Sequence, residues 1–162
     1  MWSFAGDSEM ERNARFASGR LGRFLYRWAN FSLRVLMPYA YGDRALLTPA
    51  IHRQYLERFP DRRSRGLVLW PLARAILGSS AYYDSLWSER ERLRDIPSLI
   101  VWGMRDRAFR RHQLAKWRTL LPDARVVELS AAGHWPHEEA PERVIEEVRA
   151  FLSSTTPTRI RA

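Results

Sequence analysis

The sequence predicts an α/β fold in which a helical segment is followed by the last two parallel strands of an open sheet and their helices. After Asp95 the order strand, helix, strand, helix indicates parallel strands joined by crossover helices. The run 98–102 is apolar on both faces, which is typical of a buried parallel strand. The 162 residues, 46% of them hydrophobic, suffice for one packed domain or a piece of a larger one. We expect a helical segment at 1–95, part of an α/β core at 96–153 and a basic tail at 154–162.

The helical segment is predicted from apolar side chains that recur three and four positions apart. Pro38 is expected to stop the first helical stretch, because a proline cannot continue the hydrogen-bond ladder. Thr48 and Pro49 are typical of an N-cap followed by the first helical residue. The predicted elements are a helix over 8–37 with a break around Gly19 and Gly22, a helix over 49–59, a strand-like entry and short helix within 67–77, and a helix over 81–94.

The core segment is predicted to contain two strands and two helices, namely a strand at 98–102, a helix at 110–121, a strand at 126–129 and a helix that Pro141 opens. Two parallel strands are too few for a stable sheet that is buried on both faces. The first strand would present an unpaired edge, so self-association through this edge is one hypothesis for the chain. The sequence therefore resembles the end of a sheet whose other strands are elsewhere.

The charge of the chain is strongly positive, with 27 basic and 18 acidic residues and a net charge of +9. The arginines are spread along the whole chain and Lys116 is the only lysine, so the charge favours solvated surfaces over a nucleic-acid interface. There is no cysteine, which excludes a disulfide scaffold and is compatible with the cytoplasmic location that we expect. The longest apolar run, 67–77, is too short for a membrane span and contains Arg74.

One titratable residue follows each predicted strand. Asp106 lies just after the first strand and His134 just after the second. The carboxyl ends of neighbouring parallel strands meet at one edge of the sheet, where catalytic groups gather. A carboxylate there can hold an imidazole in one tautomer, and Gly133 is expected to let the backbone turn beside it. The alternative is that Asp106 only caps the next helix and His134 is an ordinary loop histidine.

A metal site is the other chemistry that these residues suggest. His134, His137, Glu138 and Glu139 are near one another in sequence, but Pro136 interferes with helical spacing and no further His or Cys cluster exists. The sequence also has no glycine-rich loop for phosphate groups. We expect neither a metal nor a cofactor.

The stretches around Asp106 and His134 resemble a known family. The stretches IPSLIVWGMRD and LPDARVVELSAAGHWPHEEAPERVIEEVRAFL resemble the C-terminal third of an α/β-hydrolase, and specifically the haloalkane dehalogenase branch. The stretches FSLRVLMPYAYGDR, LTPAIHRQYL and WPLARAILGSSAYYDSLW are similar to the cap domain of that branch. The resemblance implies that Asp106 is the catalytic acid and His134 the catalytic histidine. It also implies that Trp135, Trp70 and Phe109 face a substrate pocket for a halogenated alkane or an epoxide.

The resemblance fails at the nucleophile, which in these hydrolases precedes the acid and the histidine in the chain. Gly6-Asp7-Ser8, Ser64-Arg65-Gly66 and Gly78-Ser79-Ser80 do not fit the required turn after a buried strand. The chain is therefore expected to be a truncated hydrolase, inactive alone, whose complete form hydrolyses carbon–halogen bonds. An epoxide hydrolase or serine esterase fragment stays open. In epoxide hydrolases tyrosines of the cap activate the epoxide, but the expected role of Tyr39, Tyr41, Tyr82 and Tyr83 is packing. A non-catalytic interaction module is a further alternative.

Overall fold

A computed structural model describes residues 8–155 of the chain. Residues 1–7 of the predicted helical segment and residues 156–162 of the predicted basic tail lie outside this range. The described chain forms two compact units, one of residues 8–39 and 47–91 and the other of residues 40–46 and 92–155. The boundary falls at 91 and not at 95, and residues 40–46, predicted in the helical segment, join the second unit.

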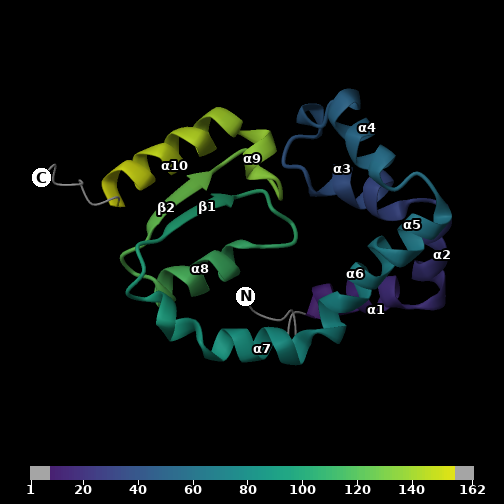
Figure 1. The fold of residues 1–162 in the computed structure, drawn as a ribbon, viewed down its shortest axis with the longest axis horizontal. Helices are drawn as coiled ribbons and strands as arrows, with labels where there is room; N and C mark the ends of the chain where they lie inside the picture. Colours follow the sequence, from purple (N-terminus) through teal and green to yellow (C-terminus); the bar gives the residue numbers. More distant parts are fainter. Residues whose placement is uncertain (1–7, 156–162) are drawn as a thin grey trace, which may run out of the picture. The chain divides into compact units, whose positions relative to one another are not determined.

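The first unit consists of helices (Figure 1). They are α1 (Ser8–Ser18), α2 (Arg20–Trp28), a π-helical turn (Ser32–Leu36), most of α3 (Met37–Ala40), α4 (Pro49–Arg58), α5 (Arg62–Leu67), α6 (Leu69–Gly78) and α7 (Ser80–Ser88). Gly19 separates α1 from α2 as predicted, but Gly22 lies inside α2. A Cβ atom at Gly22 would lie 2.3 Å from Ala17 O, so this glycine allows close packing against α1 instead of breaking the helix.

Two sequence predictions for the first unit are wrong. Pro38 does not stop the helical stretch, because the π-helical turn Ser32–Leu36 passes directly into α3; the widened turn lies just before the proline, which has no backbone N–H to donate. The run 67–77 has no strand-like entry, because Pro71 lies in the first turn of α6, where proline is tolerated. The predicted N-cap of α4 is confirmed, since the Thr48 side chain accepts from Ile51 N at 3.3 Å.

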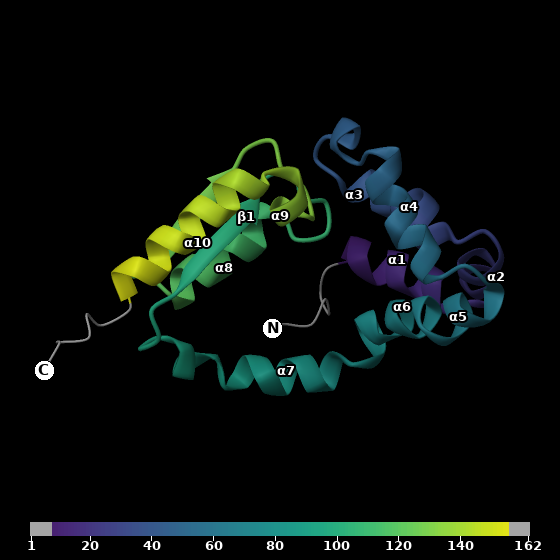
Figure 2. The ribbon, with the colours of Figure 1, turned by 45° about the horizontal axis from the view of Figure 1, so that its top comes forward.

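The second unit is a two-stranded parallel sheet with helices on both faces. Strand β1 (Leu99–Gly103) pairs with β2 (Arg125–Leu129), in the register Val101 to Val127. Helix α8 (Arg111–Leu120) lies on one face of the sheet and α10 (Pro141–Thr155) on the other (Figures 1 and 2). The unit also contains two 3₁₀ turns, Arg44–Leu46 and Arg90–Leu93, the second of which begins in the first unit, and a one-turn helix α9 (Pro136–Glu139).

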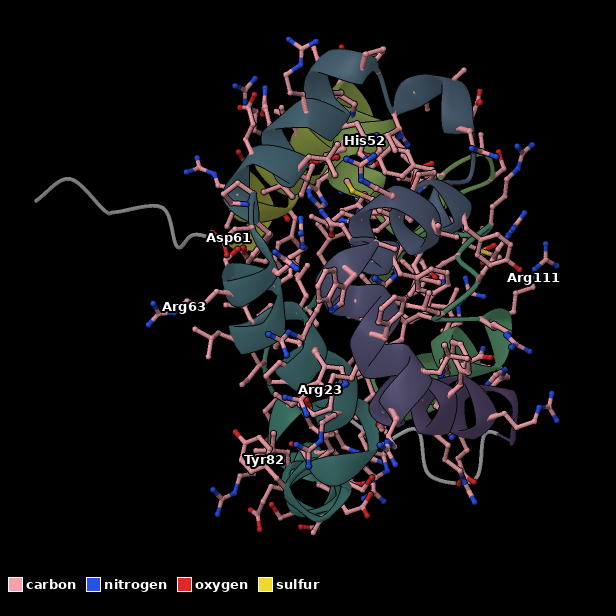
Figure 3. The ribbon with its side chains drawn as sticks, turned by 90° about the vertical axis from the view of Figure 1, so that its right-hand side faces the viewer. Arg23, His52, Asp61, Arg63, Tyr82 and Arg111 are labelled. Carbon is pink, nitrogen blue, oxygen red and sulfur yellow. The ribbon has the colours of Figure 1, made fainter. Side chains whose placement is uncertain are left out.

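Buried apolar side chains of the second unit come mainly from α8, the residue after it and β2. Leu114 and Leu120 of α8 are buried, as are Leu121 and Val127. On α10 the apolar side chains of Ile145, Val148 and Leu152 are exposed. No helix among residues 8–155 is long and apolar enough to cross a membrane. Charged groups such as Arg63 and Arg111 extend into solvent (Figure 3).

Asp61 provides a test of how the first unit responds to pH. Its carboxylate caps α5 by accepting from Ser64 N at 2.8 Å, and this backbone hydrogen bond lowers the pKa of Asp61 more than desolvation raises it. A lowered pKa means that the stabilisation is complete above the ordinary aspartate range and is lost as pH falls through the folded value. Wild type should therefore exceed Asp61→Asn in stability near neutral pH, and the difference should vanish at acid pH.

Urea unfolding followed by circular dichroism, between about pH 6 and pH 3, measures this difference. Asparagine is the matched replacement, because it keeps the capping oxygen but neither titrates nor carries the negative charge that stabilises a helix N-terminus. A constant difference across the pH range would contradict the charged cap.

Candidate active site at the carboxyl ends of the two strands

Two loops leave the same edge of the sheet and are joined by backbone hydrogen bonds. Met104 N donates to Leu129 O at 3.0 Å, and Arg105 N donates to Ala132 O at 2.9 Å. The in-register parallel pairing of β1 and β2 makes this arrangement possible, because both strands end at the same level. The first loop carries Asp106 and the second carries His134.

Asp106 and His134 form a hydrogen bond of 2.9 Å between Oδ2 and Nδ1. The Asp106 side chain is buried, with 8% exposed, whereas His134 is 29% exposed. The second carboxylate oxygen of Asp106 accepts from Ala108 N at 2.7 Å and Phe109 N at 2.9 Å. Asp106 thus closes its own loop with one oxygen and orients the imidazole with the other. When Nδ1 carries the proton, Nε2 is left as an acceptor.

Aromatic rings surround the imidazole. The Phe109 ring stacks on His134 with centroids 5.4 Å apart and an interplanar angle of 10°, while Trp135 meets it edge-on at 4.8 Å. Trp135 in turn stacks on Tyr41 at 5.2 Å. Phe109 and Trp135, two of the predicted pocket residues, therefore lie beside the histidine; that they contact substrate stays a prediction.

Trp70, the third predicted pocket residue, belongs to the other unit. It lies on α6, where its indole N–H donates to Ala17 O at 3.2 Å. The guanidinium groups of Arg23 and Arg74 lie 5.0 and 4.9 Å from its ring centroid. These contacts give Trp70 a packing role within its own unit, and its role as a pocket residue stays a prediction.

Glycines make the junction beneath His134 tight. A Cβ atom at Gly133 would lie 2.4 Å from both Ala40 O and Gly42 N, and one at Gly103 would lie 2.0 Å from Gly133 O. The φ of Gly133 is not in the left-handed region, and its expected role in a backbone turn beside the histidine stays a prediction. Its missing side chain leaves space for the backbone of residues 40–42.

Glu139 is the residue that the sequence predictions missed. Its buried carboxylate accepts from Gly42 N at 2.8 Å and from Gly133 N at 2.9 Å. Glu138 accepts a hydrogen bond from the Tyr41 hydroxyl. Both carboxylates of the suggested metal cluster are thus engaged within the fold. The described residues contain no group of three or more His, Cys, Asp or Glu that could hold a metal ion.

Two cavities lie away from the histidine. One, of about 320 Å³, is at the opposite ends of the strands, between Ile96 and Ala124. The other, of about 290 Å³, lies in the first unit and is lined by Tyr26, Ser32 and apolar side chains of α6. His134 lines neither of these two cavities, and the strand-end pair is the candidate site because of its hydrogen bond.

Comparison with known proteins gives one family. Residues 3–141 match the alpha/beta hydrolase fold family. Two curated relatives are cis-3-alkyl-4-alkyloxetan-2-one decarboxylases, from Shewanella oneidensis (40% identity over 60 residues) and Xanthomonas campestris (38% over 76 residues). These alignments cover 37% and 43% of this chain but only 19% and 25% of the relatives.

A solved structure of similar fold is the haloalkane dehalogenase DatA from Agrobacterium tumefaciens. The TM-score is 0.75 at 21% identity, and the alignment covers 92% of this chain and 52% of DatA. At this identity the likeness concerns the fold. The chain spans about half the length of the solved structure that it matches.

Proposed function

The chain belongs to the alpha/beta hydrolase fold family, and we propose that it supplies the histidine and acid of a hydrolase of the haloalkane dehalogenase type. The observation that carries this proposal is the hydrogen bond of 2.9 Å between His134 Nδ1 and the buried Asp106 carboxylate. A buried acid that fixes one imidazole nitrogen leaves the other free to accept a proton, which is the arrangement a general base requires.

In the proposed reaction His134 acts on water. A carboxylate nucleophile displaces the leaving group from an alkyl carbon and forms an ester. His134 Nε2 then takes a proton from water, the resulting hydroxide cleaves the ester, and Asp106 stabilises the imidazolium that forms. Phe109 and Trp135 hold the imidazole plane and limit the access of solvent to it.

The nucleophile for the first step is not found in this sequence. No Ser or Asp before Asp106 lies in a turn of the required Gly-x-Ser-x-Gly or Gly-x-Asp-x-Gly type. The members of such a site act as a unit, so a base and its acid without a nucleophile give negligible turnover. We therefore propose that the chain works only together with a nucleophile-bearing part of a hydrolase core.

Two substrate classes are supported. Halogenated alkanes follow from the structural neighbours, which are dehalogenases at 18–21% identity. The second class, cis-3-alkyl-4-alkyloxetan-2-ones, is favoured by the higher identity of 38–40% to enzymes that decarboxylate them. Loss of carbon dioxide from such a four-membered lactone leaves an alkene, so the two activities release different products and can be assayed side by side.

Reconstitution tests the proposal. The chain is co-expressed with the part of DatA that its alignment leaves uncovered, and the purified complex is given 1-bromobutane or a cis-3,4-dialkyloxetan-2-one. We expect bromide or alkene to accumulate over many turnovers, and neither part alone to release more than background. The matched control replaces His134 with Ala, which should stop turnover after the ester has formed.

A complex of one copy of each part that releases neither product would contradict the proposal. The same complex tested with an epoxide and a nitrophenyl ester distinguishes the epoxide hydrolase and serine esterase alternatives. Size-exclusion mass of the chain alone addresses the interaction-module alternative, for which pairing of an open edge of the two-stranded sheet predicts a dimer.

A further inference from the structure

The carboxylate of Glu139 joins two segments that are far apart in the sequence. Oε2 accepts from Gly42 N at 2.8 Å and from Asp43 N at 3.4 Å. Oε1 accepts from Gly133 N at 2.9 Å and from Trp135 N at 3.3 Å. Gly133 and Trp135 are the immediate neighbours of His134, so one side chain holds the backbone on both sides of the histidine.

The contacts require a carboxylate. Glu139 is only 8% exposed. An ionised group in such a buried position is stable only if hydrogen-bond donors surround it. Four backbone N–H groups supply that surrounding, and hydrogen bonds to an ionised acceptor are stronger than neutral ones. A glutamine keeps only one acceptor oxygen and turns an NH₂ group toward backbone N–H groups.

The junction leaves little freedom for the histidine loop. His134 N donates to Ala40 O at 3.0 Å, so the segment 40–43 contacts His134 directly as well as through Glu139. Arg105 Nη1 donates to Gly42 O at 3.3 Å from the loop that carries Asp106. Residues 40–43 therefore bridge both loops of the candidate site, and Glu139 is the buried charge that fixes this bridge.

We infer that Glu139 is a positioning residue that aims His134 Nδ1 at Asp106 by holding the backbone of Gly133, Trp135 and Gly42. The inference deepens the proposed function, since it concerns the same base, but it rests on hydrogen bonds and can be tested without turnover. It predicts that loss of the Glu139 charge changes the state of the His134 ring and not only the stability of the unit.

The test uses the full chain labelled with ¹⁵N-histidine, studied by NMR at a pH where the imidazoles are neutral. The His134 signals are assigned by their disappearance in His134→Gln. Wild type should show a single His134 tautomer with the proton on Nδ1, which the Asp106 hydrogen bond favours. In Glu139→Gln we expect the tautomer with the proton on Nε2 to appear as well.

Glu147→Gln is the matched control. Glu147 of α10 is also buried, at 3% exposed, and pairs with Arg125 at the start of β2 and with Arg143 on its own helix, away from the histidine loop. Its loss removes the same charge and also destabilises the second unit, yet should leave the His134 tautomer as in wild type. A folded Glu139→Gln chain with the wild-type tautomer would overturn the inference, and so would a tautomer change of equal size in Glu147→Gln.

Amide hydrogen exchange in the unmodified chain keeps the inference testable if Glu139→Gln does not fold. The amides of Gly42 and Gly133 should be protected together, because they donate to the two oxygens of the same Glu139 carboxylate. Rapid exchange of Gly42 beside a protected Gly133 would show that Glu139 does not join the segments, and would overturn the inference. If the second tautomer appears in Glu139→Gln as expected while the reconstituted complex is inactive, only the proposed function is contradicted.

Discussion

Replacing Asp106 with asparagine is expected to lower kcat of the reconstituted enzyme by about 10⁴-fold, the size of effect seen when an acid of this kind is changed to its amide. The substitution keeps Oδ1, which accepts from Ala108 N and Phe109 N, so the loop should keep its shape. The amide nitrogen in place of Oδ2 donates to His134 Nδ1 instead of accepting from it. The histidine is then forced into the tautomer whose Nε2 already carries a proton and cannot act as a base.

Single-turnover kinetics locate the step that is lost. Formation of the ester should proceed at the wild-type rate in Asp106→Asn, whereas its hydrolysis should stop, so the modified enzyme accumulates and can be detected by its mass. Asp123→Asn is a suitable control, because Asp123 is an exposed residue at the opposite end of the sheet. Unchanged hydrolysis in Asp106→Asn would show that another carboxylate orients His134.

The strand ends and the Asp106–His134 contact were predictable because they depend on local patterns. The apolar run before Gly103 and the one before Ser130 each specify a strand, and parallel pairing brings their carboxyl ends together. The spacing of Asp106 and His134 from those ends predicts that both lie at one edge of the sheet, whereas a helix cap and an ordinary loop histidine stay open on spacing alone. The hydrogen bond of 2.9 Å is the outcome of these short-range signals.

Glu139 and the segment 40–46 could not be predicted in the same way. Glu139 contacts Gly42 across 97 positions of the chain, and no periodicity or motif in either stretch indicates the other. A proline at 136 argues against helical spacing through this stretch, so the sequence does not predict the one-turn helix α9 that carries Glu139; in the structure Pro136 begins that helix, at a position that favours proline. The sequence does contain one indication of such a role, because two acidic residues, Glu138 and Glu139, lie within five positions after the candidate histidine.

The exposure of apolar residues on α10 could not be predicted from the sequence for a similar reason. Periodicity predicts which side chains of a helix lie on one face, but not whether a partner covers that face. With only two strands in the sheet, α10 has little to pack against, and Ile145 and Leu152 are 49% and 55% exposed. This is consistent with the alignment to about half of a dehalogenase chain.

Replacing Gly103 with alanine is expected to reduce the free energy of unfolding of the second unit by about 3 kcal/mol, at the upper end of the usual cost of overpacking. The new Cβ atom would lie 2.0 Å from Gly133 O and 2.8 Å from Ala132 O. Both obstacles are backbone atoms, and Ala132 O also accepts from Arg105 N, so they cannot move without breaking the link between the two loops. Gly103 ends β1, and the strain therefore falls directly on the candidate site.

Urea unfolding measures the loss, and Gly78→Ala is the matched control. Gly78 is the last residue of α6 and has no atom within 4 Å of an added Cβ, so alanine there should stabilise its unit by about 0.5 kcal/mol through helix propensity. The same chemical change should thus have opposite signs at the two positions. If Gly103→Ala is as stable as wild type, there is room for a Cβ atom between Gly103 and the backbone of Gly133. The close packing of these two backbones would then not explain how His134 is held against Asp106.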